Sequence, residues 1–333
     1  MRTKIIGKYK KLVVGEEDNI NVSGASGIGK DLVADRILFD LKTRGWTNIF
    51  LPSFKLNFEK FYACFKAEKP YHIKHLKMEG LKPQAMKCKN YHFYCNQFPR
   101  TSMPEFNIKT ISIKDLDDRL FLYYLSENYG ETGYLRLLID SIKKLKSDEG
   151  LYDLIGKVDK SKKQKGFEVN ASLGDKRQTS SIVQIFERYR FEPLFFPDNF
   201  EHNLNMKEII YDQEHYHCFS AKYFTDIKTR MFLNLYILLS IIKVKQKYPN
   251  SPPVAVYLDE VSAYYSANPL YEFQKPLNKI VAETLRLCRG LGINLIGTCQ
   301  AIHQIDAGVK GSFNTHILGR MSDLKDLSEL AQI

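Results

Sequence analysis

The sequence predicts an α/β fold with a mostly parallel central sheet and a helical insertion. Three observations lead to this prediction. A glycine-rich segment at residues 24–31 joins a strand-like run to a helix-like run. Apolar strand-like segments alternate with helical patterns toward both ends of the chain, as parallel sheets require. Between them, residues 115–191 change to a largely helical pattern. We therefore expect two parts of one core, at 1–114 and 192–333, separated by an insertion.

The N-terminal part begins with a βαβ pattern. A short strand candidate within residues 11–22 runs into the glycine-rich segment. Apolar residues then recur at helical spacing over Leu32–Lys42, and Asn48–Leu51 is typical of the next strand. Further short strand candidates occupy Tyr91–Cys95 and Ile108–Ile113.

The C-terminal part returns to alternating elements. We expect strands at Tyr216–Phe219, Val254–Leu258, Asn294–Thr298 and Thr315–Arg320, and helices at Asp226–Lys247 and Pro276–Leu291. The longest apolar run, Met231–Val244, is interrupted by polar residues and is shorter than a membrane span. It therefore predicts a buried helix.

The sharpest motif is Gly24-Ala25-Ser26-Gly27-Ile28-Gly29-Lys30-Asp31, which fits G-x-x-x-x-G-K between a strand and a helix. Glycines allow backbone N–H groups to turn toward phosphate oxygens. Lys30, at the start of the helix, supplies a positive charge to the β- and γ-phosphates. Motif and context predict an ATP-binding P-loop; a chance glycine-rich turn is the alternative.

One position departs from the motif. The residue after the lysine is normally Ser or Thr, whose hydroxyl binds Mg²⁺, and here it is Asp31. A carboxylate is a hard oxygen donor that can ligate Mg²⁺. It also places a negative charge near the phosphates. The motif therefore supports nucleotide binding more directly than hydrolysis.

Two later segments carry polar residues at strand ends. Val254–Leu258 is followed by Asp259 and Glu260, the form of a Walker B motif, in which the Asp holds Mg²⁺ and the Glu activates water. The segment Gly292–Gln300 is a buried strand that ends in Gln300, whose amide would act as a sensor of the γ-phosphate. The non-functional alternatives are an ordinary acidic strand end for Asp259 and Glu260, and a surface glutamine for Gln300.

Together these three segments resemble the FtsK/HerA superfamily of ring-forming, DNA-pumping ATPases, which includes conjugative coupling proteins and viral packaging ATPases. Residues Leu285–Gln300 are similar to that family's helix, strand and terminal glutamine. Residues Asp306–Arg320 are similar to its segment leading to an arginine-bearing strand. The resemblance is specific over 10–42 and 215–330 and weak between them.

The resemblance implies a RecA-like core and a homo-oligomer, a hexameric ring with an ATP site at each subunit interface. It assigns the phosphates to Lys30, Mg²⁺ to Asp31 and Asp259, the catalytic base to Glu260, the sensor to Gln300 and the arginine supplied in trans to Arg320. Arg289 and Arg286 are the next candidates for the arginine. For each arginine, an ordinary surface or interface ion pair is the alternative.

The net charge of +11 makes a polyanionic partner plausible, although excess lysine also serves simply to solvate a surface. The Lys157–Lys165 run, with Arg177, Arg188 and Arg190 after it, would either line a DNA channel or form a solvated linker. The expected partner is double-stranded DNA. A nuclease, relaxase or capsid protein encoded by the same mobile element is a further partner that the resemblance allows.

The six cysteines are scattered without a framework pattern, which favours reduced thiols in a cytoplasmic protein. The N-terminus shows no secretory signal. A window of His72, His75, Cys88, His92 and Cys95 would bind zinc or simply pack, since its spacing matches no familiar zinc site. No pattern for nucleophilic catalysis is recognisable.

These observations lead to one main hypothesis, an ATP-driven translocase of double-stranded DNA on a virus, plasmid or other mobile element. The alternative is a nucleotide-binding switch or adaptor that hydrolyses ATP poorly because of Asp31. An RNA helicase is a third option without accessory motifs to support it. Few residues precede the P-loop, and the chain stops at Ile333, so we expect a minimal or a truncated version of the family.

Overall fold

The computed structural model describes residues 18–26, 29–52, 87–94, 107–115, 142–150, 153, 194–221, 223–224, 226–271, 274–319, 325–326 and 328. The chain divides into two compact units. The larger unit combines Met1–Asn90 with Met206–Ile333, and the smaller unit is Tyr91–Asn205.

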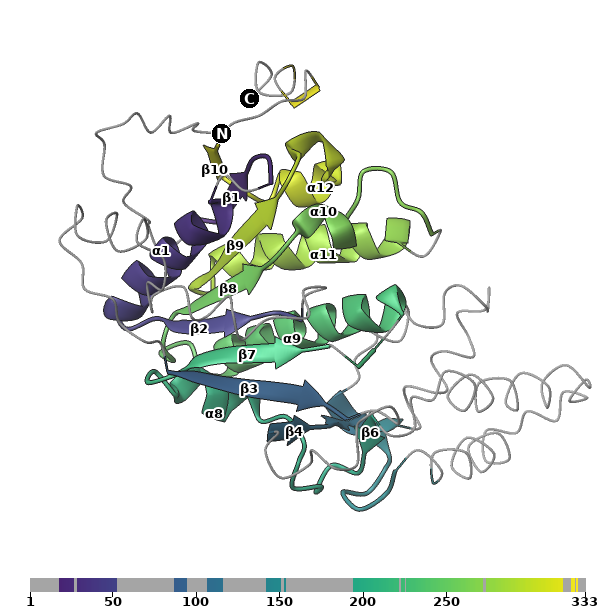
Figure 1. Ribbon diagram of the computed structural model, residues 1–333. Coiled ribbons are helices and arrows are strands. Elements are labelled where there is room, and N and C mark those ends of the chain that lie inside the picture. Colours follow the sequence, from purple (N-terminus) through teal and green to yellow (C-terminus); the bar gives the residue numbers. More distant parts are fainter. Residues whose placement is uncertain are drawn as a thin grey trace, which may run out of the picture. The chain divides into compact units, whose positions relative to one another are not determined.

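A parallel sheet forms the centre of the larger unit (Figure 1). Its strands are β1 (Ile20–Ser23), β2 (Thr47–Phe50), β7 (Tyr216–Ser220), β8 (Val254–Leu258), β9 (Ile293–Cys299) and β10 (Thr315–Leu318). They lie in the order β10-β1-β9-β8-β2-β7, and the sheet continues through β3 (Cys88–Phe93) to β4 (Asn107–Lys109). Every recorded pairing among the six strands is parallel. The predicted α/β class with a mostly parallel sheet is therefore confirmed.

Helices connect these strands. The longer ones are α1 (Lys30–Thr43), α9 (Ile227–Lys247) and α11 (Gln274–Arg289), and the short ones are α8 (Met206–Tyr211), α10 (Val261–Tyr264) and α12 (Ala307–Lys310). The predicted helix at Asp226–Lys247 is confirmed. Asp226 is its N-cap, because its carboxylate accepts a hydrogen bond from the Thr229 N–H at 2.6 Å.

Helix α1 covers one face of the sheet, and α9 and α11 lie behind the strands in Figure 1. The apolar stripe that the sequence shows on α1 is buried against alternate residues of the strands. This core consists of Ala34, Ile37, Leu38 and Leu41 from α1, with Ile20, Val22, Ile296, Ala255, Tyr257, Phe50, Tyr216 and Cys218 from the sheet. Period-two alternation puts these strand residues on one face, so α1 packs across five strands, β1, β9, β8, β2 and β7.

The smaller unit contains the end of β3, which pairs in parallel with β4. Two further short strands, β5 (Ile111–Ser112) and β6 (Phe195–Phe196), also pair in parallel. Phe196 stacks on Phe200 with ring centroids 4.3 Å apart. The helical insertion predicted over 115–191 lies almost entirely outside the described residues.

The apolar run Met231–Val244 lies within α9, where most of its residues are buried in the protein core. In the described part of the chain, no helix has both the length and the apolarity that a membrane crossing needs.

Candidate active site

The glycine-rich segment forms the turn between β1 and α1. The N–H of Gly24 donates to the carbonyl of Cys299 on β9 at 3.2 Å, which ties the start of the turn to the neighbouring strand. Gly29 is the N-cap of α1 and has a φ of 87°, in the left-handed region that favours glycine. Lys30 is then the first helical residue. Gly27 and Ile28 lie outside the described residues.

Lys30 is buried beside a carboxylate. Lys30 is 8% exposed, and its Nζ lies 3.4 Å from Oε2 of Glu260. A buried ammonium needs a partner, because desolvation penalises an isolated charge. The lysine predicted to bind phosphates is thus held by the glutamate predicted to act as the base.

Asp259 and Glu260 follow directly after β8 and differ in their surroundings. Asp259 is 4% exposed and accepts hydrogen bonds from the Thr298 hydroxyl at 2.9 Å and from the Tyr257 hydroxyl at 3.4 Å. Glu260 is partly exposed. Its φ is 52°, and among the described residues no other non-glycine residue has a positive φ. Left-handed backbone is costly for a residue with a Cβ, so the surroundings must hold Glu260 in place.

Gln300 contributes through its backbone. Its N–H donates to Oε1 of Glu260 at 2.9 Å, while its side chain is exposed. The two oxygens of Glu260 are therefore held from two directions, by Lys30 and by the strand end that carries Gln300.

These residues meet because of the strand order. β9 lies between β1 and β8, and all three run parallel, so their carboxyl ends share one edge of the sheet. Ligands of open α/β sheets bind outside this edge. The chain brings together residues more than two hundred positions apart, such as Lys30 and Glu260.

Burial and neighbouring acids act on the Tyr257 phenol at this edge. Burial, with the charges of Asp259 and Asp31 added, raises the pKa of the Tyr257 phenol well above its usual value. Asp31 lies in the first turn of α1 and Asp259 at the end of β8. Tyr257 therefore stays protonated and remains a hydrogen-bond donor to Asp259.

The donor set fits a nucleotide with Mg²⁺. Helix α1 is a 14-residue helix whose N-cap, Gly29, provides no side-chain cap, so its first N–H groups face the glycine-rich turn. Lys30 adds a positive charge there. Asp31 and Asp259 are carboxylates, the hard oxygen donors that Mg²⁺ prefers.

The remaining predicted residues are less informative. Arg320 lies outside the described residues, as do His72, His75 and Cys95 of the predicted zinc window. Within the described part of the chain, no group of three His, Cys, Asp or Glu side chains is arranged to hold a metal. Arg289 donates to the Ser312 carbonyl at 2.7 Å, and Arg286 is exposed on α11.

The sequence reading did not single out Thr298 and Tyr257. Tyr257 shares a face of β8 with Asp259, because side chains two apart point the same way. Thr298 is one of two polar residues, with Asn294, in a fully buried strand. Either signal could have marked them, since buried hydroxyl groups require partners.

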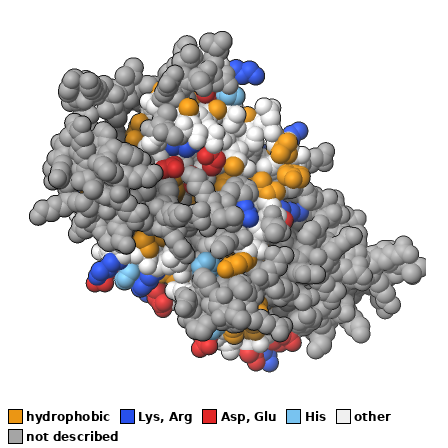
Figure 2. Space-filling view, viewed as in Figure 1, with side chains coloured by type: hydrophobic (Ala, Val, Ile, Leu, Met, Phe, Trp, Pro, Cys, Tyr) orange, Lys and Arg blue, Asp and Glu red, His pale blue; other side chains and the backbone are white. Residues whose placement is uncertain are grey.

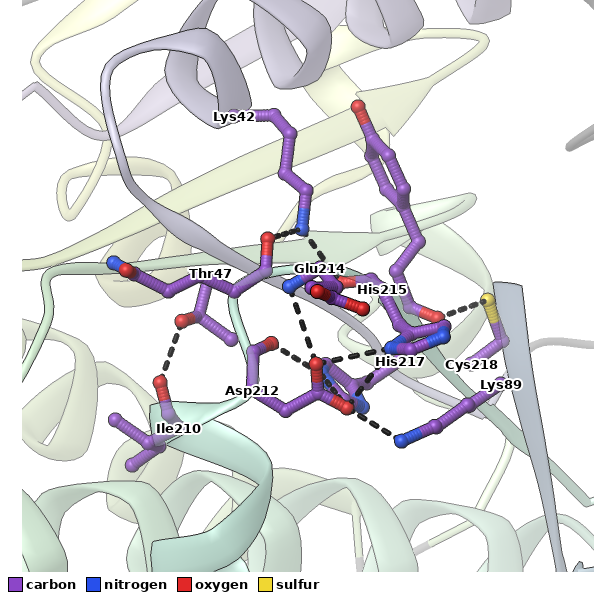
Figure 3. Close-up of polar contacts among 11 residues, drawn as sticks. Lys42, Thr47, Lys89, Ile210, Asp212, Glu214, His215, His217 and Cys218 are labelled. Carbon is purple, nitrogen blue, oxygen red and sulfur yellow. Dashed lines mark hydrogen bonds and ion pairs between the residues drawn. The ribbon is translucent and has the colours of Figure 1, made fainter. Parts of the chain in front are cut away.

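A second polar cluster lies at the opposite, amino end of β7, where side chains converge on the carboxylate of Asp212 (Figure 3). Lys89 Nζ donates to Asp212 Oδ2 at 2.6 Å, and Nδ1 of His215 lies 3.0 Å from Oδ1. His217 donates from Nε2 to the Asp212 carbonyl at 2.9 Å. Lys42, near the end of α1, donates to the His215 carbonyl at 2.8 Å. These contacts fasten α8, β7, β3 and α1 together.

The described surface carries charges of both signs. On the face in Figure 2, basic and acidic side chains are interspersed among the described residues. The lysine run at 157–165 and the arginines after it, which the sequence offered as a DNA-contacting loop, lie outside those residues.

No family model matches the chain, and no curated protein matches its sequence. Solved structures do share its fold. VirB4 of Thermoanaerobacter pseudethanolicus aligns with a TM-score of 0.56 and 12% identity over 94% of this chain and 80% of its own. The bacterial conjugative coupling protein TrwBdeltaN70, in a trigonal form with sulphate, aligns with a TM-score of 0.50 and 13% identity over 91% and 70%.

The genome packaging NTPase B204 of Sulfolobus turreted icosahedral virus 2, in complex with AMP, aligns at a TM-score of 0.41 and 9% identity, over 96% of this chain and 83% of its own. At such identities the VirB4 and TrwB likenesses establish the fold alone. The predicted RecA-like P-loop fold is therefore confirmed, and the likeness to conjugative coupling proteins is confirmed as a likeness of fold.

Proposed function

We propose that this chain is an ATPase that uses hydrolysis to translocate double-stranded DNA. The observation that carries the proposal is the meeting of Lys30, Asp259 and Glu260 at one edge of three adjacent parallel strands. A cation for phosphates, a buried carboxylate and a second carboxylate for water are the parts that phosphoryl transfer needs. The fold shared with a conjugative coupling protein supports DNA as the cargo, by analogy.

Each residue has a distinct part in this proposal. Lys30 at the start of α1 neutralises the β- and γ-phosphates. Asp259, with Asp31, holds the Mg²⁺ ion, which when bound would offset phosphate charge. Glu260 accepts a proton from the attacking water once Lys30 has turned to the phosphates. Gln300 follows β9 closely enough to report the state of the γ-phosphate to the rest of the strand.

The proposal includes a homo-oligomeric ring. Arg320 of a neighbouring copy would complete each site by offsetting charge in the transition state. A mixing experiment tests this arrangement. Lys30→Ala and Arg320→Ala proteins, each inactive alone, should regain ATPase activity together, because mixed interfaces contain one intact site. Absence of recovery, or a monomer in the presence of ATP and Mg²⁺, would contradict the ring.

The decisive experiment measures ATPase rate with and without double-stranded DNA. DNA should stimulate the wild-type rate of ATP hydrolysis. Lys30→Ala and Glu260→Gln should each abolish this DNA-stimulated hydrolysis. Lys279→Ala is the matched control, because Lys279 is an exposed lysine of α11 outside the candidate site. Equal stimulation by single-stranded RNA would point to an RNA motor instead.

A second function is favoured by one specific feature. Asp31 puts a carboxylate in the first turn of α1, where a hydroxyl normally stands, and so opposes the phosphate charge. A nucleotide-binding switch or adaptor needs binding without rapid turnover. Tight nucleotide binding with no hydrolysis under any DNA condition would establish this function and exclude the motor.

A further inference from the structure

Thr298 lies in the candidate site beside Asp259 and Glu260. It is fully buried near the end of β9, between β1 and β8. The register pairs Leu258 with Gly297, so Thr298 lies next to Asp259 across the two strands. β9 is otherwise apolar apart from Asn294, and a buried hydroxyl at this place requires hydrogen-bond partners.

The hydroxyl of Thr298 joins the two acidic residues. It donates to Oδ1 of Asp259 at 2.9 Å and accepts the backbone N–H of Glu260 at 3.2 Å. The Tyr257 hydroxyl lies 3.4 Å from Thr298 Oγ1 and also 3.4 Å from Asp259 Oδ1. A hydroxyl has one proton to donate and two lone pairs, so one side chain can serve both acids at once.

The contact with Glu260 matters because its backbone is strained. Glu260 is held in the left-handed region, with a φ of 52°, at the start of α10. Thr298 fixes its N–H, and the Gln300 N–H fixes its carboxylate. Thr298 of β9 and Gln300, which directly follows β9, therefore both hold Glu260, and Thr298 also contacts Asp259.

We propose that Thr298 is a positioning residue for nucleotide hydrolysis: its hydroxyl orients the Asp259 carboxylate toward Mg²⁺ and holds the Glu260 backbone so that its side chain reaches the attacking water. The inference rests on the proposed function. Groups that orient metal ligands in this way typically change affinity or activity by about 10- to 100-fold when they are removed.

Two substitutions separate the hydroxyl from the shape of the side chain. Thr298→Val keeps the volume and removes the hydroxyl, whereas Thr298→Ser keeps the hydroxyl and removes a methyl group. Thr284→Val is the matched control. Thr284 is also fully buried, and its hydroxyl donates to the Ile280 carbonyl at 2.7 Å within α11. It therefore reports the cost of a buried threonine hydroxyl away from the site.

Three quantities are measured for each protein: kcat, thermal midpoint, and the affinity for a fluorescent ATP analogue with Mg²⁺ and with EDTA. Thr298→Val should lower kcat by about 10- to 100-fold and reduce the gain in affinity that Mg²⁺ provides. Its affinity in EDTA should stay within about two-fold of wild type, because Lys30 is untouched. Thr298→Ser should recover most of kcat, and Thr284→Val should keep both kcat and the Mg²⁺ response.

Wild-type kcat and Mg²⁺ response in Thr298→Val would overturn the inference. So would a Thr298→Ser protein as impaired as Thr298→Val, because the methyl group rather than the hydroxyl would then matter. If Thr298→Val does not fold, Thr298→Ala takes its place, since the smaller side chain leaves room for a water beside Asp259. If the wild type binds nucleotide without hydrolysing it, the proposed function fails, and the Mg²⁺ response alone decides the role of Thr298. A wild type that binds no nucleotide overturns both.

Discussion

The Nζ of Lys30 and the Oε2 of Glu260 lie 3.4 Å apart and form an ion pair across the candidate site. The pair joins the first residue of α1, which follows β1, to the residue after Asp259, which follows β8, and so spans the intervening strand β9. Each side chain holds the other away from its proposed task. In the proposed function, phosphates would compete with Glu260 for Lys30, and their binding would free the carboxylate to accept a proton.

The first prediction concerns this competition. Glu260→Gln removes the carboxylate that holds Lys30, so affinity for a fluorescent ATP analogue should rise by about two- to five-fold, the worth of a partly exposed ion pair. Hydrolysis should fall below detection, because an amide accepts no proton from water. Glu283→Gln, on the exposed face of α11, should change neither quantity. Weaker nucleotide binding by Glu260→Gln would show that the ion pair does not compete with phosphate.

Asp31 carries the second prediction. Asp31→Thr removes a negative charge next to the phosphates and restores the usual hydroxyl. Affinity for ATP in EDTA should rise by about five-fold, for a repulsion on the order of 1 kcal/mol at partial exposure. With Mg²⁺ the difference should shrink, since the carboxylate then meets a cation. Asp40→Asn, near the other end of α1, is the charge-matched control. An unchanged affinity in EDTA would place Asp31 too far from the phosphates to matter.

The sequence predicts what is encoded locally. Val254–Leu258 is found as predicted, because an apolar run bounded by Pro253 and Asp259 is a complete strand signal in itself. Helix α9 is found within one residue of its predicted start, because Asp226 is a visible cap. The four-residue helix α10 was missed, since so short an element has no periodicity to detect.

What the sequence could not supply is the contact between distant strands. Each motif residue can be identified from the sequence alone. The strand order β1-β9-β8, and the strand pairing that places Thr298 beside Asp259, depend on tertiary structure. The left-handed backbone of Glu260 is likewise set by its partners, because no local rule assigns such a conformation to glutamate.

Gly297 provides the third prediction. A Cβ at this position would meet Val261 Cγ2 at 2.7 Å and Phe313 Cζ at 2.9 Å. Gly297→Ala should therefore lower the free energy of unfolding by about 1–3 kcal/mol. It should also lower kcat, because Val261 directly follows Glu260 and must move. The single tryptophan, Trp46, is buried in the larger unit, so its fluorescence in urea follows unfolding. Gly290→Ala, which has nothing within 4 Å, should be neutral, and equal stability of both variants would refute the close packing.

The fourth prediction is a pH dependence at the Asp212 cluster. Burial disfavours the charged carboxylate, but hydrogen bonds from Lys89 and His215 outweigh it and hold the pKa of Asp212 below its ordinary value. A depressed folded-state pKa stabilises the protein above the unfolded pKa, about 3.9, and this contribution is lost as the pH falls further. Asp212→Asn should thus lower the free energy of unfolding by about 1 kcal/mol at pH 7, a modest figure because the Lys89 side chain is 43% exposed to solvent.

The difference between Asp212→Asn and wild type should shrink as the pH falls below about 4, because Asp212 of the unfolded chain then takes up a proton while the folded carboxylate, with its lowered pKa, stays charged. Glu214→Gln is the matched control, because Glu214 is an exposed acid two residues away and its loss should leave stability unchanged at both pH values. Urea unfolding followed by Trp46 fluorescence measures the stability of both variants. Trp46 is close to the cluster, because the carbonyl of its neighbour Gly45 accepts a hydrogen bond from Gln213, which follows Asp212. A difference that persists undiminished at pH 3 would mean that Asp212 acts through its shape and backbone contacts rather than through its charge.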